Sequence, residues 1–147
     1  NLEFYNKSYG NHLINNFRAI LFYAITFKNK NIKDIFSNLI DEYLNDFIED
    51  GFTKDFSSHY QLLVYFWLYD LSEFAKHTSQ NNLRSMLDKY RKPLYEKSMF
   101  FYSQKSKNFS LFGDISPDLP PNYLISLLDR EYFFDNQYSA QLLFRKN

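Results

Sequence analysis

The sequence predicts an all-α protein made of antiparallel helical hairpins. Apolar residues recur at steps of three and four through most of the chain, which is the spacing of one helix face. The periodic stretches are joined by short connections, which favour antiparallel neighbours. Such hairpins build a bundle, a solenoid or part of an (α/α) toroid, and no fixed-period repeat decides among these three.

Two helices are predicted in the first third of the chain. Apolar stripes run through residues 13–25 and 32–48. We expect Asn31 to cap the second helix, because an asparagine oxygen accepts hydrogen bonds from the free amides of a first turn. We expect Gly51 to end that helix, because glycine adopts the left-handed conformation without strain.

The pattern continues with a third helix over residues 58–76, which starts with a serine cap, and a fourth from Asn81. Pro93 should kink or restart the fourth helix, because proline lacks the amide hydrogen. Residues 103–121 are rich in proline and predict a long ordered loop. A short helix is expected over residues 122–130, and the tail after it has only weak periodicity.

Composition narrows the classes of function. The 147 residues suit one domain, and 45% of them are hydrophobic, enough for a core. Lys+Arg and Asp+Glu each total 17, so the basic surplus typical of a nucleic-acid binder is missing. Cysteine is absent, and no run of about 20 apolar residues predicts a membrane span. The many aromatic rings are expected to fill the core, with a sugar-stacking surface as the alternative.

Titratable side chains stand at two predicted helix starts. Tyr60 can donate a proton to a leaving oxygen, and it needs a cationic or hydrogen-bonding neighbour to act as a base. Histidine is the side chain suited to proton transfer near neutral pH, so His12 or His59 could serve this role. The alternative for each is a core or capping role. We interpret the placement as a proton-transfer site between neighbouring helices.

Amides and a carboxylate accompany these groups. Asn11 can stabilise a substrate carboxylate whose charge spreads on proton loss, although a helix cap is the alternative. Asn15 and Asn16 follow one turn later and either reach the same cleft or hold Asn11. Asp114 either orients a group in the cleft or binds backbone amides of its own turn. No ligand spacing, phosphate loop or dinucleotide fingerprint is found, so we expect neither metal nor cofactor.

Three ordered motifs resemble those of the heparinase II/III-like polysaccharide lyases and their alginate-lyase relatives. They are Asn11-His12-Leu13-Ile14-Asn15-Asn16, Asp50-Gly51-Phe52 with Ser57-Ser58-His59-Tyr60, and Phe112-Gly113-Asp114. The resemblance covers about residues 10–121. It implies an (α/α) toroid followed by a β-sandwich domain, and β-elimination at a uronic-acid residue of an acidic polysaccharide.

The resemblance also implies roles for individual residues. Asn11 and His12 correspond to the pair that neutralises the sugar carboxylate, and Tyr60 to the catalytic acid, which in some relatives is also the base. The family commonly has a histidine after this tyrosine, whereas here Gln61 follows and His59 precedes. We assign His59, together with the two asparagines of the first motif, Asn15 and Asn16, to substrate binding.

The family's second domain supplies a further catalytic histidine, and no histidine follows His77 in this sequence. We therefore expect a fragment of the helical domain that is inactive alone. Its partner would be the remainder of a longer chain or a β-sandwich domain, and a periplasmic or cell-envelope location is compatible. The alternative is a helical carbohydrate-binding or protein-interaction module without chemistry.

Overall fold

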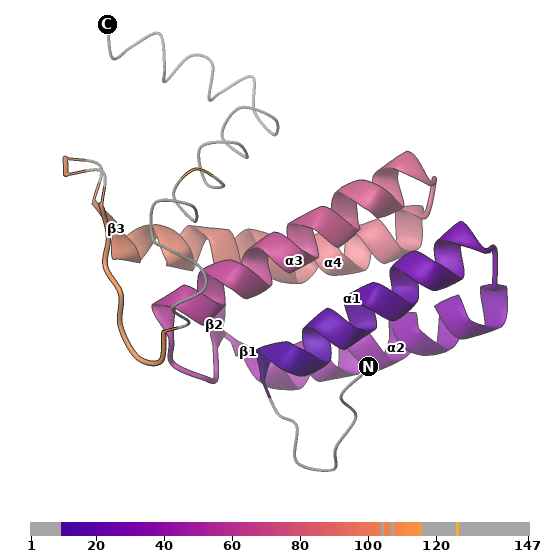
Figure 1. The fold of residues 1–147 in the computed structure, drawn as a ribbon, viewed down its shortest axis with the longest axis horizontal. Coiled ribbons are helices and arrows are strands. Elements are labelled where there is room, and N and C mark those ends of the chain that lie inside the picture. Colours follow the sequence, from indigo (N-terminus) through magenta and orange to yellow (C-terminus); the bar gives the residue numbers. More distant parts are fainter. Residues whose placement is uncertain (1–9, 104, 107, 116–125, 127–147) are drawn as a thin grey trace, which may run out of the picture.

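The computed structural model describes residues 10–103, 105, 106, 108–115 and 126 (Figure 1). In this part of the chain four long helices alternate with short connections, so the all-α prediction is confirmed. None of these four helices is long and apolar enough to cross a bilayer. The short helix predicted over residues 122–130 and the tail after it lie outside the description.

The first antiparallel hairpin consists of α1 (Asn11–Thr26) and α2 (Lys30–Phe47). The cap of α2 is Asn29, whose side-chain oxygen accepts a hydrogen bond from the amide of Ile32 at 3.2 Å. The prediction of Asn31 as the cap was wrong, because the turn between the helices is tighter than the apolar pattern indicated and α2 begins two residues earlier.

The second hairpin consists of α3 (Ser58–His77) and α4 (Asn81–Ser98). Helix α4 continues through Pro93, so the predicted start of a new helix at this residue was wrong. The buried side chains of Leu87 and Leu94 hold α4 in the core on both sides of the proline. Packing therefore maintains the helical path although one amide hydrogen is missing.

A short hairpin connects α2 to α3. Strand β1 (Ile48–Glu49) pairs with β2 (Phe52–Thr53), and Asp50 and Gly51 form the turn with φ values of 51° and 80°. Gly51 was predicted to end α2, but the helix stops at Phe47 and the glycine serves the hairpin turn instead. Two positive φ angles at the centre are typical of the tight turns that match strand twist.

A second short hairpin follows α4 and a 3₁₀ turn, η1 (Met99–Phe101). Strand β3 (Tyr102–Ser103) pairs with β4 (Asn108–Phe109). The ordered loop predicted from residue 103 therefore begins with paired strands. Its last part, from residue 116, lies outside the described residues.

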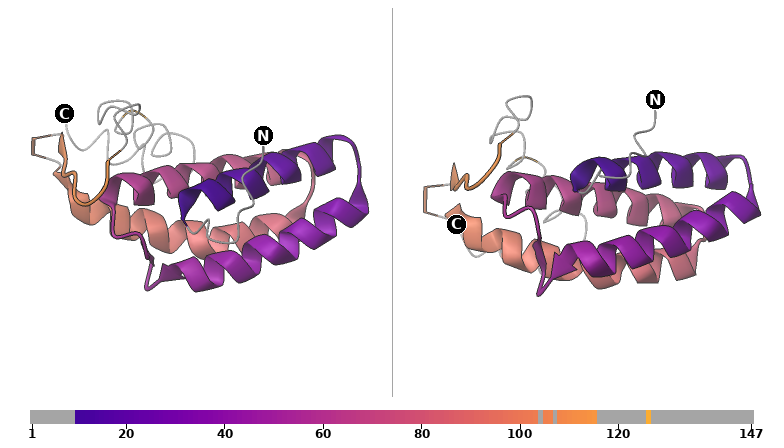
Figure 2. Two further views of the ribbon diagram at one scale, coloured as in Figure 1. Left: turned by 60° about the horizontal axis from the view of Figure 1, so that its bottom comes forward. Right: turned by 90° about the horizontal axis from the view of Figure 1, so that it is seen from below.

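The four helices form two layers, with α1 beside α3 and α2 beside α4 (Figure 2). The rings of Phe22 and Phe74 lie 4.5 Å apart, and Arg18 forms an ion pair with Asp70. Both pairs join residues the same number of positions apart, so α1 and α3 run parallel and begin at the same end. Between the layers lies the core, whose fully buried side chains include Ile14, Leu21, Ile40, Leu44, Leu62, Tyr65, Leu68, Leu71, Leu87 and Leu94.

A polar contact joins α2 to α4. The hydroxyl of Tyr90 donates a hydrogen bond to the Asp41 carboxylate at 2.6 Å, and Lys89 Nζ donates to the same hydroxyl at 3.1 Å. Burial, followed by the Asp41 hydrogen bond, raises the pKa of Tyr90 above its ordinary 10.0. The neutral phenol is therefore the form that the folded protein stabilises.

This shift predicts a loss of stability at high pH. Tyr90 contributes its full stabilisation below the unfolded pKa, about pH 10, and loses it as the pH rises through the higher folded pKa. Urea unfolding measured between about pH 8 and about pH 11 should show a steeper decline for the wild type than for Tyr90→Phe. Parallel declines would contradict the assignment.

Gly51 is predicted to tolerate no side chain. A Cβ there would lie 2.8 Å from Lys97 Cγ and 2.9 Å from the Pro93 carbonyl oxygen, in addition to the positive φ. We expect Gly51→Ala to lower the free energy of unfolding by about 2–4 kcal/mol. Gly10→Ala is the matched control, because Gly10 has φ +107° and nothing within 4 Å of its Cβ position. Equal losses in the two variants would rule out the steric contact.

Candidate functional site

The start of α3 positions Tyr60 and His59. Ser57 caps the helix, its Oγ accepting the Tyr60 amide at 3.1 Å. Tyr60 is half-buried, whereas His59 has no exposed surface, and their ring centroids lie 5.5 Å apart. With no exposed surface, His59 does not offer its ring directly to a ligand in this arrangement.

The start of α1 carries Asn11, which is half-buried, and His12, which is exposed. The residue before them is fixed to α2: the Gly10 amide donates to the Tyr43 hydroxyl at 2.7 Å, and that hydroxyl is 3.0 Å from the Gly10 carbonyl. Tyr43 also stacks on Phe47, with ring centroids 5.5 Å apart. The direction in which α1 begins is therefore set by the end of α2.

The structure brings these two helix starts to one end of the molecule (Figure 1). The contacts of Arg18 with Asp70 and of Phe22 with Phe74 fix the register of α1 against α3. Carried back along both helices, this register places Asn11 level with Leu63, about one turn short of Tyr60. Asn11, His12 and Tyr60 thus lie at the same end of the helices, as the predicted site requires.

The other two asparagines of the first motif differ in exposure. Asn15 is exposed, and its side-chain oxygen accepts a hydrogen bond from Arg18 Nη1 at 3.2 Å. Asn16 is 8% exposed and belongs to the buried part of the helix. Of the two, Asn15 is the one whose surface a substrate could reach.

The third motif is bound to the start of α3. Ser57 Oγ donates to the Asp114 carbonyl, and the Ser58 amide donates to the Phe112 carbonyl at 3.0 Å. The Phe112 amide donates in turn to Ser58 Oγ at 2.8 Å, and this hydroxyl donates to the Ser110 carbonyl at 2.9 Å. We call residues 110–114 the strap. The sequence identified a serine cap but did not predict the role of Ser58, for which only the serine doublet gave a signal.

Gly113 allows the strap to lie this close. Its φ is +78°, and a Cβ would collide with the carbonyl oxygen of Phe56 and lie 3.0 Å from Ser57 Cα. The Asp114 carboxylate accepts the amide of Ile115 at 2.9 Å. In this structure Asp114 therefore orders its own turn while its carbonyl anchors the strap.

A cavity of about 390 Å³ opens beside the same helix start. We call it the aromatic pocket, because Phe52, Phe56, Phe101 and Phe112 line it. Phe56 is 76% exposed and has φ 52°, a left-handed conformation that costs a bulky residue about 1–3 kcal/mol. This pocket was not predicted from the sequence, because phenylalanines abound throughout the chain and no spacing distinguishes these four.

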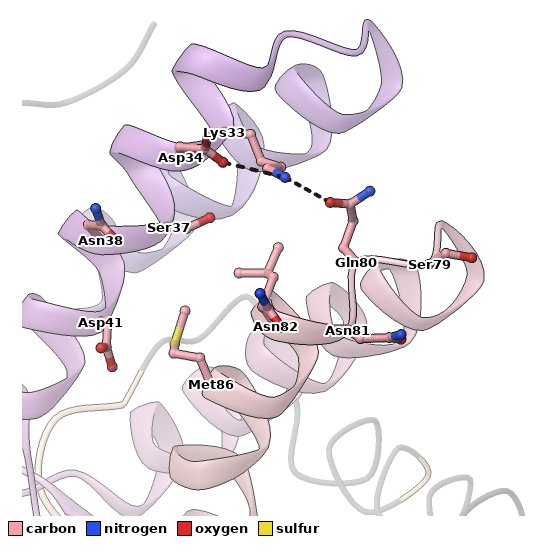
Figure 3. A pocket seen from close by; sticks show the side chains of 11 residues that line it. Lys33, Asp34, Ser37, Asn38, Asp41, Ser79, Gln80, Asn81, Asn82 and Met86 are labelled. Atoms are coloured by element: carbon pink, nitrogen blue, oxygen red, sulfur yellow. Dashed lines mark hydrogen bonds and ion pairs between the residues drawn. The ribbon is translucent and has the colours of Figure 1, made fainter.

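A second and larger hollow, about 730 Å³, lies between α2 and the start of α4 (Figure 3). Lys33 reaches across it, with Nζ 3.4 Å from the Asp34 carboxylate and 3.0 Å from the Gln80 side-chain oxygen. Its lining is mostly amide and hydroxyl groups, and it contains none of the predicted catalytic residues. The lining amide and hydroxyl groups include those of Ser37, Asn38, Ser79, Asn81 and Asn82.

No group of three or more metal-binding side chains occurs among the described residues. No protein-family model, curated protein or solved structure matches the chain.

The double role of Ser57 predicts separable effects. Ser57→Ala should lower the free energy of unfolding by about 1–2 kcal/mol, because both the cap and the bond to the strap are lost. Ser57→Asp should recover part of the stability, since aspartate accepts the Tyr60 amide but cannot donate to the Asp114 carbonyl. Urea unfolding gives the stabilities, and amide hydrogen exchange at Tyr60 reports the cap. Full recovery in Ser57→Asp would show that the bond to the strap contributes nothing.

Proposed function

We propose that this chain is the helical part of a polysaccharide lyase-like protein that cleaves an acidic polysaccharide by β-elimination at a uronic-acid residue. The observation that carries the proposal is the meeting of three distant motifs at one end of the helices. The starts of α1 and α3 lie at that end, and the strap that contains the third motif is hydrogen-bonded to Ser57 and Ser58.

The reaction suits the residues at this end. Asn11 and His12 would bind the sugar carboxylate and stabilise the charge that spreads into it when a base, supplied by the remainder of the longer chain, takes the proton from C5. The electron pair forms the C4–C5 double bond, the bond from C4 to the glycosidic oxygen breaks, and the Tyr60 phenol gives that oxygen a proton. His59, whose ring lies beside that of Tyr60, would orient the phenol.

The packing of the hairpins supports a toroid as the larger architecture. Helices α1 and α3 pack together through Phe22 and Phe74, whereas α2 and α4, although joined by the Tyr90–Asp41 hydrogen bond, are separated over part of their length by the larger hollow. Each hairpin is thus set at an angle to the next, and a series of such hairpins curves with α1 and α3 on the concave side. The candidate site would then lie at the ends of the inner helices, where the remainder of a longer chain or a β-sandwich domain would complete it.

The second candidate function is a carbohydrate-binding or protein-interaction module without chemistry. The complete burial of His59 and the exposure of the aromatic pocket favour it over a lyase. Turnover distinguishes the two, because a binding module retains polysaccharide without forming an unsaturated product.

The test is a lyase assay of the full-length protein on a panel of uronate polymers, followed by ultraviolet absorbance of the unsaturated product. Tyr60→Phe should lower the rate by about 100- to 10,000-fold with the fold retained, because the proton donor is removed. Tyr23→Phe, an exposed tyrosine on α1, is the control and should keep the wild-type rate. An unchanged rate in Tyr60→Phe would remove this residue from the mechanism.

A further inference from the structure

We propose that the aromatic pocket binds a neutral sugar unit, one without carboxylate or sulfate, of the same glycan whose uronate would lie at Tyr60. The glycan as ligand rests on the proposed function, whereas the preference for a neutral ring rests on the pocket itself. Its volume, about 390 Å³, is within the range of small-molecule sites.

The aromatic rings are held in solvent by the backbone that carries them. The Phe56 amide donates to the Thr53 carbonyl at 3.2 Å, and its own carbonyl lies against Gly113. These contacts fix the left-handed conformation and leave the ring 76% exposed. The Phe112 ring is 66% exposed, while its amide and carbonyl bind Ser58. Strained, exposed residues of this kind are characteristic of ligand-binding positions.

Two carboxylates define the polar side of the aromatic pocket. Glu49 and Asp50 are exposed and line it, and carboxylate oxygens accept hydrogen bonds from hydroxyl groups. The lining residue Lys54 has its Nζ 3.4 Å from the Asp46 carboxylate. The charge that faces the aromatic pocket is therefore negative overall, and it disfavours an acidic unit.

Among the described residues, Lys97 also lies near the aromatic pocket, although it does not line it. Lys97 Nζ is 5.5 Å from the centroid of the Phe52 ring and 5.4 Å from that of Phe100, so its charge is directed at aromatic faces. A neutral pyranose ring fits the remaining surface, because its C–H face is apolar and its hydroxyl edge donates hydrogen bonds. An alternating glycan would thus place its uronate at Tyr60 and a neutral neighbour on the rings.

The experiment is a titration of the ¹⁵N-labelled chain with two neutral probes, cellotetraose and chitotetraose, and with the acidic probe tetragalacturonate. We expect a neutral tetramer to shift the amides of Thr53, Phe56 and Gly113 and to bind at least about tenfold more tightly than the acidic one. Phe112→Ala should weaken this binding by about tenfold or more. Phe27→Ala is the matched control, because that ring is 69% exposed at the opposite end of α1.

Neutralising the two carboxylates of the aromatic pocket provides a second measurement. Glu49→Gln combined with Asp50→Asn should strengthen binding of tetragalacturonate, and asparagine keeps the left-handed turn that Asp50 adopts. The proposal is overturned if neither neutral probe shifts these amides, or if the acidic probe, followed on the same amides, binds the wild type as tightly. Concentration-dependent self-association that disappears in Phe112→Ala would reassign the rings to a protein contact. Tyr60→Phe should retain binding of the neutral tetramer, because Tyr60 does not line the aromatic pocket. The binding result therefore stands or falls independently of the lyase assay.

Discussion

One end of this molecule depends on hydrogen-bond partners for the first backbone amides of α3. A helix start leaves donors without partners inside the helix, and burial makes each unpaired donor costly. Here a serine doublet solves the problem, since Ser57 accepts the Tyr60 amide and Ser58 exchanges hydrogen bonds with the strap. The same bonds fix the position of Tyr60, the rim of the aromatic pocket and the path of the chain after β4.

Local features of the helices could be predicted because they depend on near neighbours in the sequence. The apolar stripes gave the four helices within a few residues, and the serine cap of α3 followed from hydroxyl chemistry at a helix start. Asn29 was missed because the choice between two nearby asparagines depends on how tightly the chain turns after α1. The restart predicted at Pro93 was wrong because the core contacts of Leu87 and Leu94 outweigh one lost amide bond.

The candidate site could be predicted only in part, because its arrangement depends on contacts between distant segments. Sequence analysis assigned Asn11, His12 and Tyr60 to one site, and the structure adds that their helices begin at one end. The bonds of Ser58 to the strap join segments more than fifty positions apart, which no local pattern reveals, and the complete burial of His59 likewise depends on tertiary packing. The aromatic pocket is hidden in a sequence with 17 phenylalanines, because only packing separates exposed rings from core rings.

The strap also differs from the helical hairpins in how its contacts form. Each helical hairpin closes a short loop, whereas the bond from Ser57 to Asp114 joins residues 57 positions apart. Long loops cost more entropy to close and reward the chain only once the rest is in place. Each hairpin can therefore close on its own, whereas the strap and the α1–α3 contact both join segments more than fifty positions apart. In the native state, this difference makes detachment of the strap a local opening event that leaves the four helices folded.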